Sequence, residues 1–341
     1  MNLKKVCFEL AASVGTSGDE VEACEKAKEY LSEYMPCKID RLGSVIGSSG
    51  DGKVHILLDA HIDQIGLVVR GIDEKGFILV DKVGGMDLRI LTGAEVIVHG
   101  KEDLFGVICS VPPHLQSKDD GKESLDLKKM AVDIGYSKEK AEELVSIGDR
   151  ITMRNSQHEL LNENISSSAF DDRCSVAAVL RALEITKGRL SNIKLTVLFS
   201  TQEETSGSGA KAGAFSAMPD YAIAVDVGFG DDPYTDKTQT IELGKGPSIG
   251  ISPTLDRALT KELVEIAKSN NIPYQHDVMG GRTGTNADSI TTTGCGVKTA
   301  LLSIPLRYMH TANEIINVDD IENTAELIAE FLLKKEAEAN A

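Results

Sequence analysis

Tryptophan is absent from the 341-residue sequence, and aromatic residues make up only 4% of it. Carbohydrate sites commonly use aromatic side chains as platforms, so this composition counts against a sugar-binding protein. No run approaches the roughly 20 apolar residues that a membrane-spanning helix needs. Residues 1–5 lack the apolar segment and cleavage site of a signal peptide. These absences predict a cytoplasmic protein with no membrane partner.

Basic residues are also few: 36 Lys and Arg stand against 53 Asp and Glu, which gives a net charge of −17. A nucleic-acid-binding protein needs a basic surface for the phosphate backbone, so we expect no nucleic-acid partner. The six cysteines are scattered, and no pair has the spacing of a zinc knuckle or a redox motif. They are expected to be reduced thiols, which again indicates the cytosol.

The chain is longer than one ordinary core usually accommodates, and 41% of it is apolar, so we expect two domains. Residues 54–60 and 193–199 are apolar runs typical of buried central strands. From residue 67 to 111 the pattern changes to short alternating segments separated by glycines, which indicates a small β-barrel or sandwich. The sequence therefore predicts the α/β fold class with a separate β-rich module.

The β-rich pattern interrupts the α/β pattern, which returns near Asn162. The two flanking segments must therefore meet in one domain. We predict a discontinuous catalytic domain of residues 1–66 and 158–341, with an inserted domain of residues 67–157. Expected helices are 3–14, a helix capped by Ser17 and ending at Met35, 138–146, 170–186, 255–269 and one opened by Asn317 or Asp319. Expected strands are 38–48, 53–60, 67–72, 77–81, 95–99, 104–111, 149–153, 193–199, 221–227 and 297–304, with a charged loop at 118–122 and a glycine-rich loop at 207–210.

Candidate functional side chains follow the apolar strands or begin the helices after them. Open α/β sheets bind ligands beyond the carboxyl ends of their strands, so these side chains can converge on one rim. Each has an ordinary structural explanation by itself, such as an Asp that interacts with a helix dipole. Their joint placement favours a site centred on the stretch Ser200–Glu204. The candidates are His61, Asp63, Asp171, Asp172, Glu203, Glu204, Asp226 and His310.

Carboxylate and imidazole ligands without thiolates suit zinc, cobalt or manganese. Two such ions that share a carboxylate form a hydrolytic site, because they lower the pKa of a water molecule and polarise a carbonyl group. A nearby carboxylate that binds no ion can then transfer the proton. The adjacent Glu203 and Glu204 can divide these two tasks between them.

Five motifs occur in order and at fitting separations: His61–Gly66, Ala169–Arg173, Gln202–Glu204, Val225–Asp226 and Arg307–Thr311. Together they resemble family forty-two of the metallopeptidases, the tetrahedral (TET) aminopeptidases. The resemblance covers nearly the whole chain. It implies a three-layer α/β/α catalytic domain of zinc-aminopeptidase type, with an inserted PDZ-like β domain that makes dimer contacts. It also implies peptide substrates and dimers that assemble into a hollow tetrahedral dodecamer.

The same resemblance implies an aminopeptidase with two divalent metal ions per subunit. Zinc is the expected metal, with cobalt and manganese as alternatives. His61 and Asp226 would hold one ion, and Glu204 and His310 would hold the other. Asp171 would bridge the two ions.

Two more residues receive roles from the resemblance. Glu203 would be the general base and acid, and Asp63 would orient the imidazole two residues before it. The sequence departs from the family pattern at Thr205, where a Val-Gly start is expected after the Glu-Glu pair, and at Gln64, where Glu is frequent. The loop Gly280–Asp288 is assigned to the pocket for the first substrate side chain, with a purely structural turn as the alternative.

Rival functions remain beside the aminopeptidase. A glycoside hydrolase such as an endoglucanase needs two carboxylates roughly 5 to 9.5 Å apart that flank the bond. Glu203 and Glu204 are adjacent, and the histidines would then have no role. A deacylase or carboxypeptidase on the same scaffold stays open, because the order of ligands does not exclude it. A metal-free assembly protein is disfavoured because all five ligand positions carry competent side chains. The acidic charge could attract peptides with a cationic N-terminus, or it could serve only solubility.

Overall fold

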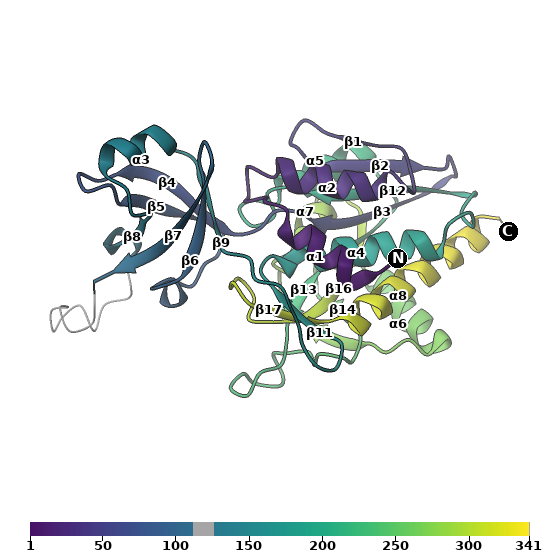
Figure 1. Ribbon diagram of the computed structural model, residues 1–341. Coiled ribbons are helices and arrows are strands. Elements are labelled where there is room, and N and C mark those ends of the chain that lie inside the picture. Colours follow the sequence, from purple (N-terminus) through teal and green to yellow (C-terminus); the bar gives the residue numbers. More distant parts are fainter. Residues whose placement is uncertain (112–125, 341) are drawn as a thin grey trace.

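The computed structural model describes residues 1–111 and 126–340. A large α/β part is joined to a smaller barrel that stands to one side of it (Figure 1). The predicted charged loop at residues 118–122 lies outside the described residues. Among the described residues, no helix combines the length and the apolar character that crossing a membrane requires.

Four parallel strands form the centre of the large sheet. β3 (Val54–His61) lies between β12 (Ile193–Ser200) and β13 (Tyr221–Phe229), and β16 (Lys298–Arg307) pairs with the far side of β13. Most of their residues are buried, as expected for strands that are covered on both faces. Because parallel strands end at the same edge, four carboxyl ends lie along one rim.

Antiparallel strands extend this centre on both sides into an 11-stranded sheet over the described residues. The path runs β1-β2-β12-β3-β13-β16-β17-β11-β10, and β14 joins β16 to β15 beside it. The outer strands are β1 (Cys37–Ile39), β2 (Val45–Ser49), β10 (His158–Glu159), β11 (Asn164–Ser167), β14 (Ser248–Ile251), β15 (Gln275–Val278) and β17 (Glu314–Asn317).

Helices cover both faces of the sheet. Alternate residues of β3 enter two different cores: Ile56 and Leu58 join the larger core, and Leu57 joins the smaller one. This period of two is the direct consequence of strand geometry. The expected three-layer α/β/α fold is therefore confirmed. The larger core contains α1 (Leu3–Ala12), α2 (Val21–Leu31), α4 (Phe170–Ile185), α6 (Arg257–Asn270) and α8 (Val318–Ala339), and the smaller contains α5 (Ser208–Ala217) and α7 (Asn286–Thr291).

The β-rich segment forms a closed barrel with the strand order β4-β5-β8-β7-β6-β9. It has a hydrophobic core of its own, which includes Leu67, Val80 and Ile151. Closure removes free strand edges, so the small module is stable without extending the large sheet. Its elements are β4 (Gly66–Ile72), β5 (Ile78–Val83), β6 (Glu95–His99), β7 (Asp103–Ser110), β8 (Met130–Asp133), α3 (Lys138–Leu144) and β9 (Arg150–Met153), with short 3₁₀ turns at Leu88–Ile90 and Leu127–Lys129.

Several local predictions were wrong. Residues 38–48 form the hairpin β1–β2 and not one strand, because the Asp40 carboxylate accepts hydrogen bonds from the backbone N–H groups of residues 42 and 44 and fixes a turn. Glu20, and not Ser17, occupies the N-cap position of α2, and the helix ends at Leu31. Residues 208–210 of the predicted loop form the first turn of α5. Gly207, which precedes the helix, has a left-handed backbone conformation.

Candidate metal centre

The candidate residues gather at the carboxyl ends of the parallel strands, as the sequence predicts. His61 is the last residue of β3, Asp226 lies near the end of β13, and Asp171 stands at the start of α4. Glu204 follows β12, where Gln202 turns the chain with a φ of 61°. His310 follows β16. The rim thus combines residues from five separate segments of the chain.

A first group contains His61, Asp171 and Asp226, all of them buried. The Nε2 atom of His61 lies 3.0 Å from Oδ1 of Asp171 and 3.9 Å from Oδ1 of Asp226. One donor atom of each residue lies within 4.8 Å of the others, so the three can reach one cation.

A second group contains Asp171, Glu204 and His310. The Nε2 atom of His310 lies 3.1 Å from Oδ2 of Asp171 and 3.3 Å from Oε1 of Glu204. Asp171 therefore directs one carboxylate oxygen to each group. A shared carboxylate between two imidazole–carboxylate groups is the donor set that two hydrolytic divalent ions require. The residues present fit a dinuclear centre.

Carboxyl groups are concentrated at this rim. Burial, together with neighbouring carboxylates, raises the pKa of Asp226 well above its usual value. Burial also raises the pKa of Glu203 to about 7; His61 opposes this rise, and the charges of Glu204 and Asp171 add to it. Burial would lower the pKa of His61, but its contacts with Asp171 and Asp63 raise that pKa well above the ordinary value. Such buried carboxylates are normally paired or bound to a metal ion.

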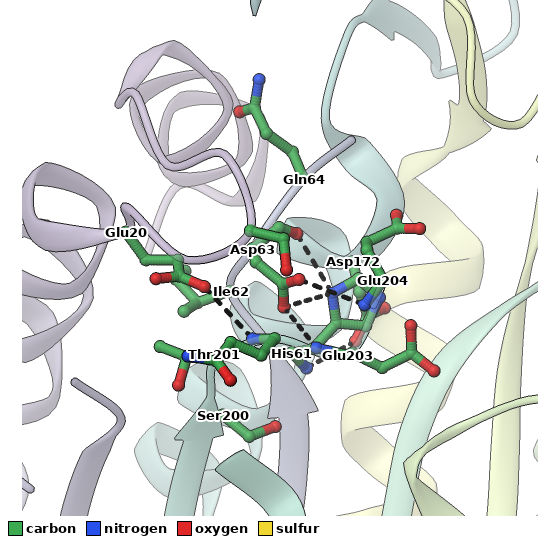
Figure 2. A network of polar contacts seen from close by, with 12 residues as sticks. Glu20, His61, Ile62, Asp63, Gln64, Asp172, Ser200, Thr201, Glu203 and Glu204 are labelled. Atoms are coloured by element: carbon green, nitrogen blue, oxygen red, sulfur yellow. Dashed lines mark hydrogen bonds and ion pairs between the residues drawn. The ribbon is translucent and has the colours of Figure 1, made fainter. Parts of the chain in front are cut away.

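Asp63 organises the turn that carries the two glutamates. Its side chain is fully buried. Its Oδ1 atom accepts a hydrogen bond from the backbone N–H of Glu203 (3.0 Å), and its Oδ2 atom accepts one from Glu204 (3.1 Å) (Figure 2). The Nδ1 atom of His61 lies 3.1 Å from the carbonyl oxygen of Asp63 and 3.5 Å from its carboxylate. Asp63 thus fixes both the imidazole and the glutamate turn.

Glu314 is a positioning residue that the sequence analysis missed. Its buried carboxylate accepts hydrogen bonds from the backbone N–H of Asp171 (3.1 Å) and of His310 (2.9 Å). Asp172 plays a similar part, because its Oδ2 atom accepts a hydrogen bond from the backbone N–H of His61 (3.1 Å). The sequence carries no separate signal for Glu314, since a Glu at the start of a short strand has no characteristic spacing.

A cavity of about 420 Å³ opens beside the two groups. His61, Asp171, Glu203, Glu204, Asp226 and His310 line one part of it, and Thr283, Gly284 and Thr285 of the predicted pocket loop line another. A larger groove of about 1000 Å³ lies between β1–β2 and α5, but no residue of the two groups lines it. The smaller cavity is therefore the one that can hold a reacting group.

Comparison with known proteins identifies the family. The family model described as M42 glutamyl aminopeptidase matches residues 43–327. The chain belongs to this family. It is therefore a metal-dependent aminopeptidase, a hydrolase, and the resemblance stated from the motifs is confirmed.

Relatives of the M42 chain extend over most of its length. It is 35% identical to a putative aminopeptidase of Acetivibrio thermocellus over 94% of the chain and 95% of that protein. It is 34% identical to the lysyl aminopeptidase of Pyrococcus furiosus over 86% of each chain.

Solved structures agree with this assignment. A TET aminopeptidase from the marine sediment archaeon Thaumarchaeota archaeon SCGC AB-539-E09 has a TM-score of 0.94 at 28% identity, covering 99% of this chain and 97% of that one. The TET1 peptidase of Pyrococcus horikoshii, which can assemble into a tetrahedron or a large octahedral shell, has a TM-score of 0.86 at 32% identity (98% and 100% covered). A Thermotoga maritima structure named endoglucanase has a TM-score of 0.79 at 29% identity (98% of each chain).

Proposed function

We propose that this M42 chain removes N-terminal residues from peptides with a dinuclear metal centre and a glutamate general base. The observation that carries the proposal is the placement of Asp171, whose two carboxylate oxygens face two separate imidazole–carboxylate groups. His61 and Asp226 would hold one ion, Glu204 and His310 the other, and Asp171 both. When bound, such ions lower the pKa of water and polarise a carbonyl group.

Glu203 is the proposed proton carrier. It lines the same cavity as the two groups but belongs to neither of them. The backbone N–H of Glu203 donates a hydrogen bond to the Asp63 carboxylate. This contact fixes the position of the Glu203 backbone beside Glu204. In the proposed reaction Glu203 takes a proton from the attacking water and later gives it to the leaving amine. The carbonyl carbon loses the amine and gains the oxygen of water, so the step is a balanced hydrolysis.

The variant Glu203→Gln tests this role. It removes the base and keeps the size of the side chain, so we expect both metal ions to remain bound while the rate on a leucine p-nitroanilide falls about 10²- to 10⁴-fold. Metal content is measured on the desalted protein by mass spectrometry. His310→Ala is the matched control, because it should lose metal as well as activity. A Glu203→Gln protein with nearly wild-type turnover would assign the proton transfer to another group.

The hydrolase rivals differ in their substrates. A deacylase would act on acylated amino acids, and a carboxypeptidase would act at the other end of a peptide. Membership of an aminopeptidase family supports the first proposal over both. The purified, metal-loaded protein should therefore release the N-terminal residue of an unmodified peptide. It should not remove the acetyl group from an N-acetylated peptide, and it should not release the C-terminal residue. Zinc, cobalt and manganese are added separately, with zinc expected to give activity.

We further propose the division of the chain into a catalytic domain of residues 1–66 and 158–341 and a dimerisation domain of residues 67–157. The closed barrel from β4 to β9, with its own core, supports this division. Dimers would assemble into a tetrahedral dodecamer, as the P. horikoshii relative forms a tetrahedron. Light scattering after size-exclusion chromatography tests the assembly: a mass near twelve times 36.6 kDa is expected. The thiols of all six cysteines are free, which supports a cytoplasmic location.

A further inference from the structure

The reaction cavity has a second charged region, away from the candidate metal ligands. Its lining includes Asp277 and Met279 at the end of β15, Phe229 of β13 and Leu301 of β16. Apart from Glu203 and the five candidate ligands, Asp277 is the only charged residue that lines the described part of this cavity. The cavity therefore presents the metal centre in one region and a single carboxylate among apolar side chains in another.

The carboxylate of Asp277 has no partner in the part of the chain that the structure describes. Within residues 1–111 and 126–340, its side chain has neither a hydrogen-bond partner nor an ion-pair partner, although the residue is half-buried. Burial is the cause that raises the pKa of Asp277. The nearest arginine in sequence, Arg282, is largely exposed and pairs with Asp288. A half-buried carboxylate without a partner is unfavourable in the free protein, and a cationic ligand would remove that cost.

Sheet register separates Asp277 from the metal centre. Asp226 lies opposite Ser303, Ser303 opposite Ser248, and Ser248 opposite Gln275. Three steps between neighbouring strands amount to roughly 14 Å between the backbones, at about 4.8 Å per step. Asp277 is two residues further along β15. A substrate's α-amino group is adjacent to the scissile carbonyl and stays near the metal centre, whereas the end of a long side chain can extend toward Asp277.

The apolar neighbours of Asp277 fit the stem of such a side chain. Met279 and Leu301 line the cavity with it. Lysine and arginine bury their methylene groups against apolar surface while the charged end seeks a polar partner. A neutral side chain of the same length would gain the apolar contacts but would leave the carboxylate unpaired.

We propose that Asp277 selects peptides whose N-terminal residue is lysine or arginine, by pairing with the side-chain cation of that residue. This inference rests on the proposed aminopeptidase activity and specifies its substrate class. Asp277 is a specificity-determining residue in this assignment. It takes no part in bond cleavage.

The test compares two substrates that differ by one charge: the p-nitroanilides of L-lysine and of L-norleucine, whose side chain lacks the ammonium group. Rates are measured on the full-length, metal-loaded protein and on Asp277→Asn, which keeps the shape and removes the charge. Glu265→Gln is the matched control, because Glu265 is exposed on α6 and the same charge is removed outside the cavity. Melting temperature and metal content are measured for each protein.

We expect wild type to cleave the lysine substrate with a kcat/KM about 10- to 100-fold above that of norleucine, the range of one hydrogen-bonded charge pair. Asp277→Asn should bring the ratio of the two kcat/KM values close to one, because the lysine substrate loses its partner. Glu265→Gln should keep the preference. Equal cleavage of both substrates by wild type, or an equal loss on both in Asp277→Asn, overturns the inference while the aminopeptidase activity stands. A wild-type protein that cleaves neither substrate overturns the proposed function, and the inference with it.

Discussion

Replacement of Arg173 by methionine should destabilise the protein more than any single change to a surface ion pair. Arg173 is fully buried in the first turns of α4. Its guanidinium donates hydrogen bonds to the carbonyl oxygens of Leu10, Ser13 and Ile62 and to the amide oxygen of Gln64. It therefore ties the end of α1 and the segment after β3 to α4.

The magnitude follows from the acceptors that lose their donor. Methionine fills most of the volume but donates no hydrogen bond. The carbonyl oxygen of Leu10 would keep the backbone N–H of Ser13, but the other three oxygens would lose the donor that the structure shows for them. Each such group costs about 1–3 kcal/mol. The three are neighbours and are not independent, so their costs do not add. We expect a loss of about 3–5 kcal/mol for Arg173→Met, within the range measured when one member of a buried polar group is removed.

Arg181 provides the matched control on the same helix. Its guanidinium pairs with Glu322 and Glu184 at the surface, with 27% of the side chain exposed. Surface ion pairs contribute about 0–1 kcal/mol because water and salt screen them. We therefore expect Arg181→Met to cost less than about 1 kcal/mol, although Arg181 contacts two carboxylates and Arg173 contacts neutral oxygens.

Urea unfolding, monitored by circular dichroism, gives the free energy of unfolding of both variants and of wild type. All proteins are measured at one concentration and with EDTA present. Metal is removed so that ion binding does not contribute to the difference. Arg173→Lys is a further variant: it keeps the charge and some of the donors, so its stability should lie between wild type and Arg173→Met. If Arg181→Met proved as damaging as Arg173→Met, the buried carbonyl contacts would not be what joins these segments.

Three further changes test the centre and its surroundings. Asp63→Asn leaves only one oxygen for the two backbone N–H groups of Glu203 and Glu204, so metal affinity or turnover should fall about 10- to 100-fold; unchanged values for both would contradict the positioning role. Chelation with EDTA should abolish activity and lower the melting temperature, with recovery on adding zinc, because the buried carboxylates lose their cations; activity that persists at zero measured metal would refute the dinuclear proposal. Burial raises the pKa of Glu20 from 4.5 to about 7, so wild type should lose stability as the pH rises from 4.5 through 7. Glu20→Gln should match wild type near pH 4 and exceed it by about 1–3 kcal/mol at pH 8 in urea unfolding, whereas parallel pH curves would remove Glu20 as the cause.

The grouping of the candidate residues at one rim of the sheet could be predicted from the sequence, because these residues follow recognisable strands. The run 54–60 and the run 193–199 are largely apolar, so their role as central strands could be recognised without any structure. Once those strands are parallel, the polar residues that follow them must meet at one edge. That reasoning brings His61 and Glu204 together from distant parts of the chain. Their metal-binding roles came from the family resemblance and stay predictions.

Backbone contacts explain what the sequence could not reveal. Glu314 acts through hydrogen bonds from the backbone of two other segments, and no side-chain pattern records such bonds. The hairpin between β1 and β2 depends on one side chain, Asp40, which closes a turn inside an otherwise strand-like run. β8 is a short strand held by pairing with β5 and β7, so its stability comes from its partners more than from its own residues.

Two buried carboxyl groups outside the metal-binding groups position four of the five segments that carry the candidate ligands. Asp63 joins the end of β3 to the turn after β12, and Glu314 joins the start of α4 to the turn after β16. Each uses both oxygens to accept backbone N–H groups. A carboxyl group offers two oxygens to such donors, whereas an amide could accept at only one atom. The donor atoms of the centre are thus oriented by acidic residues that need no contact with a metal ion. Glu314→Gln should therefore reduce metal affinity much as Asp63→Asn does, although the two residues lie on different segments and share no direct contact.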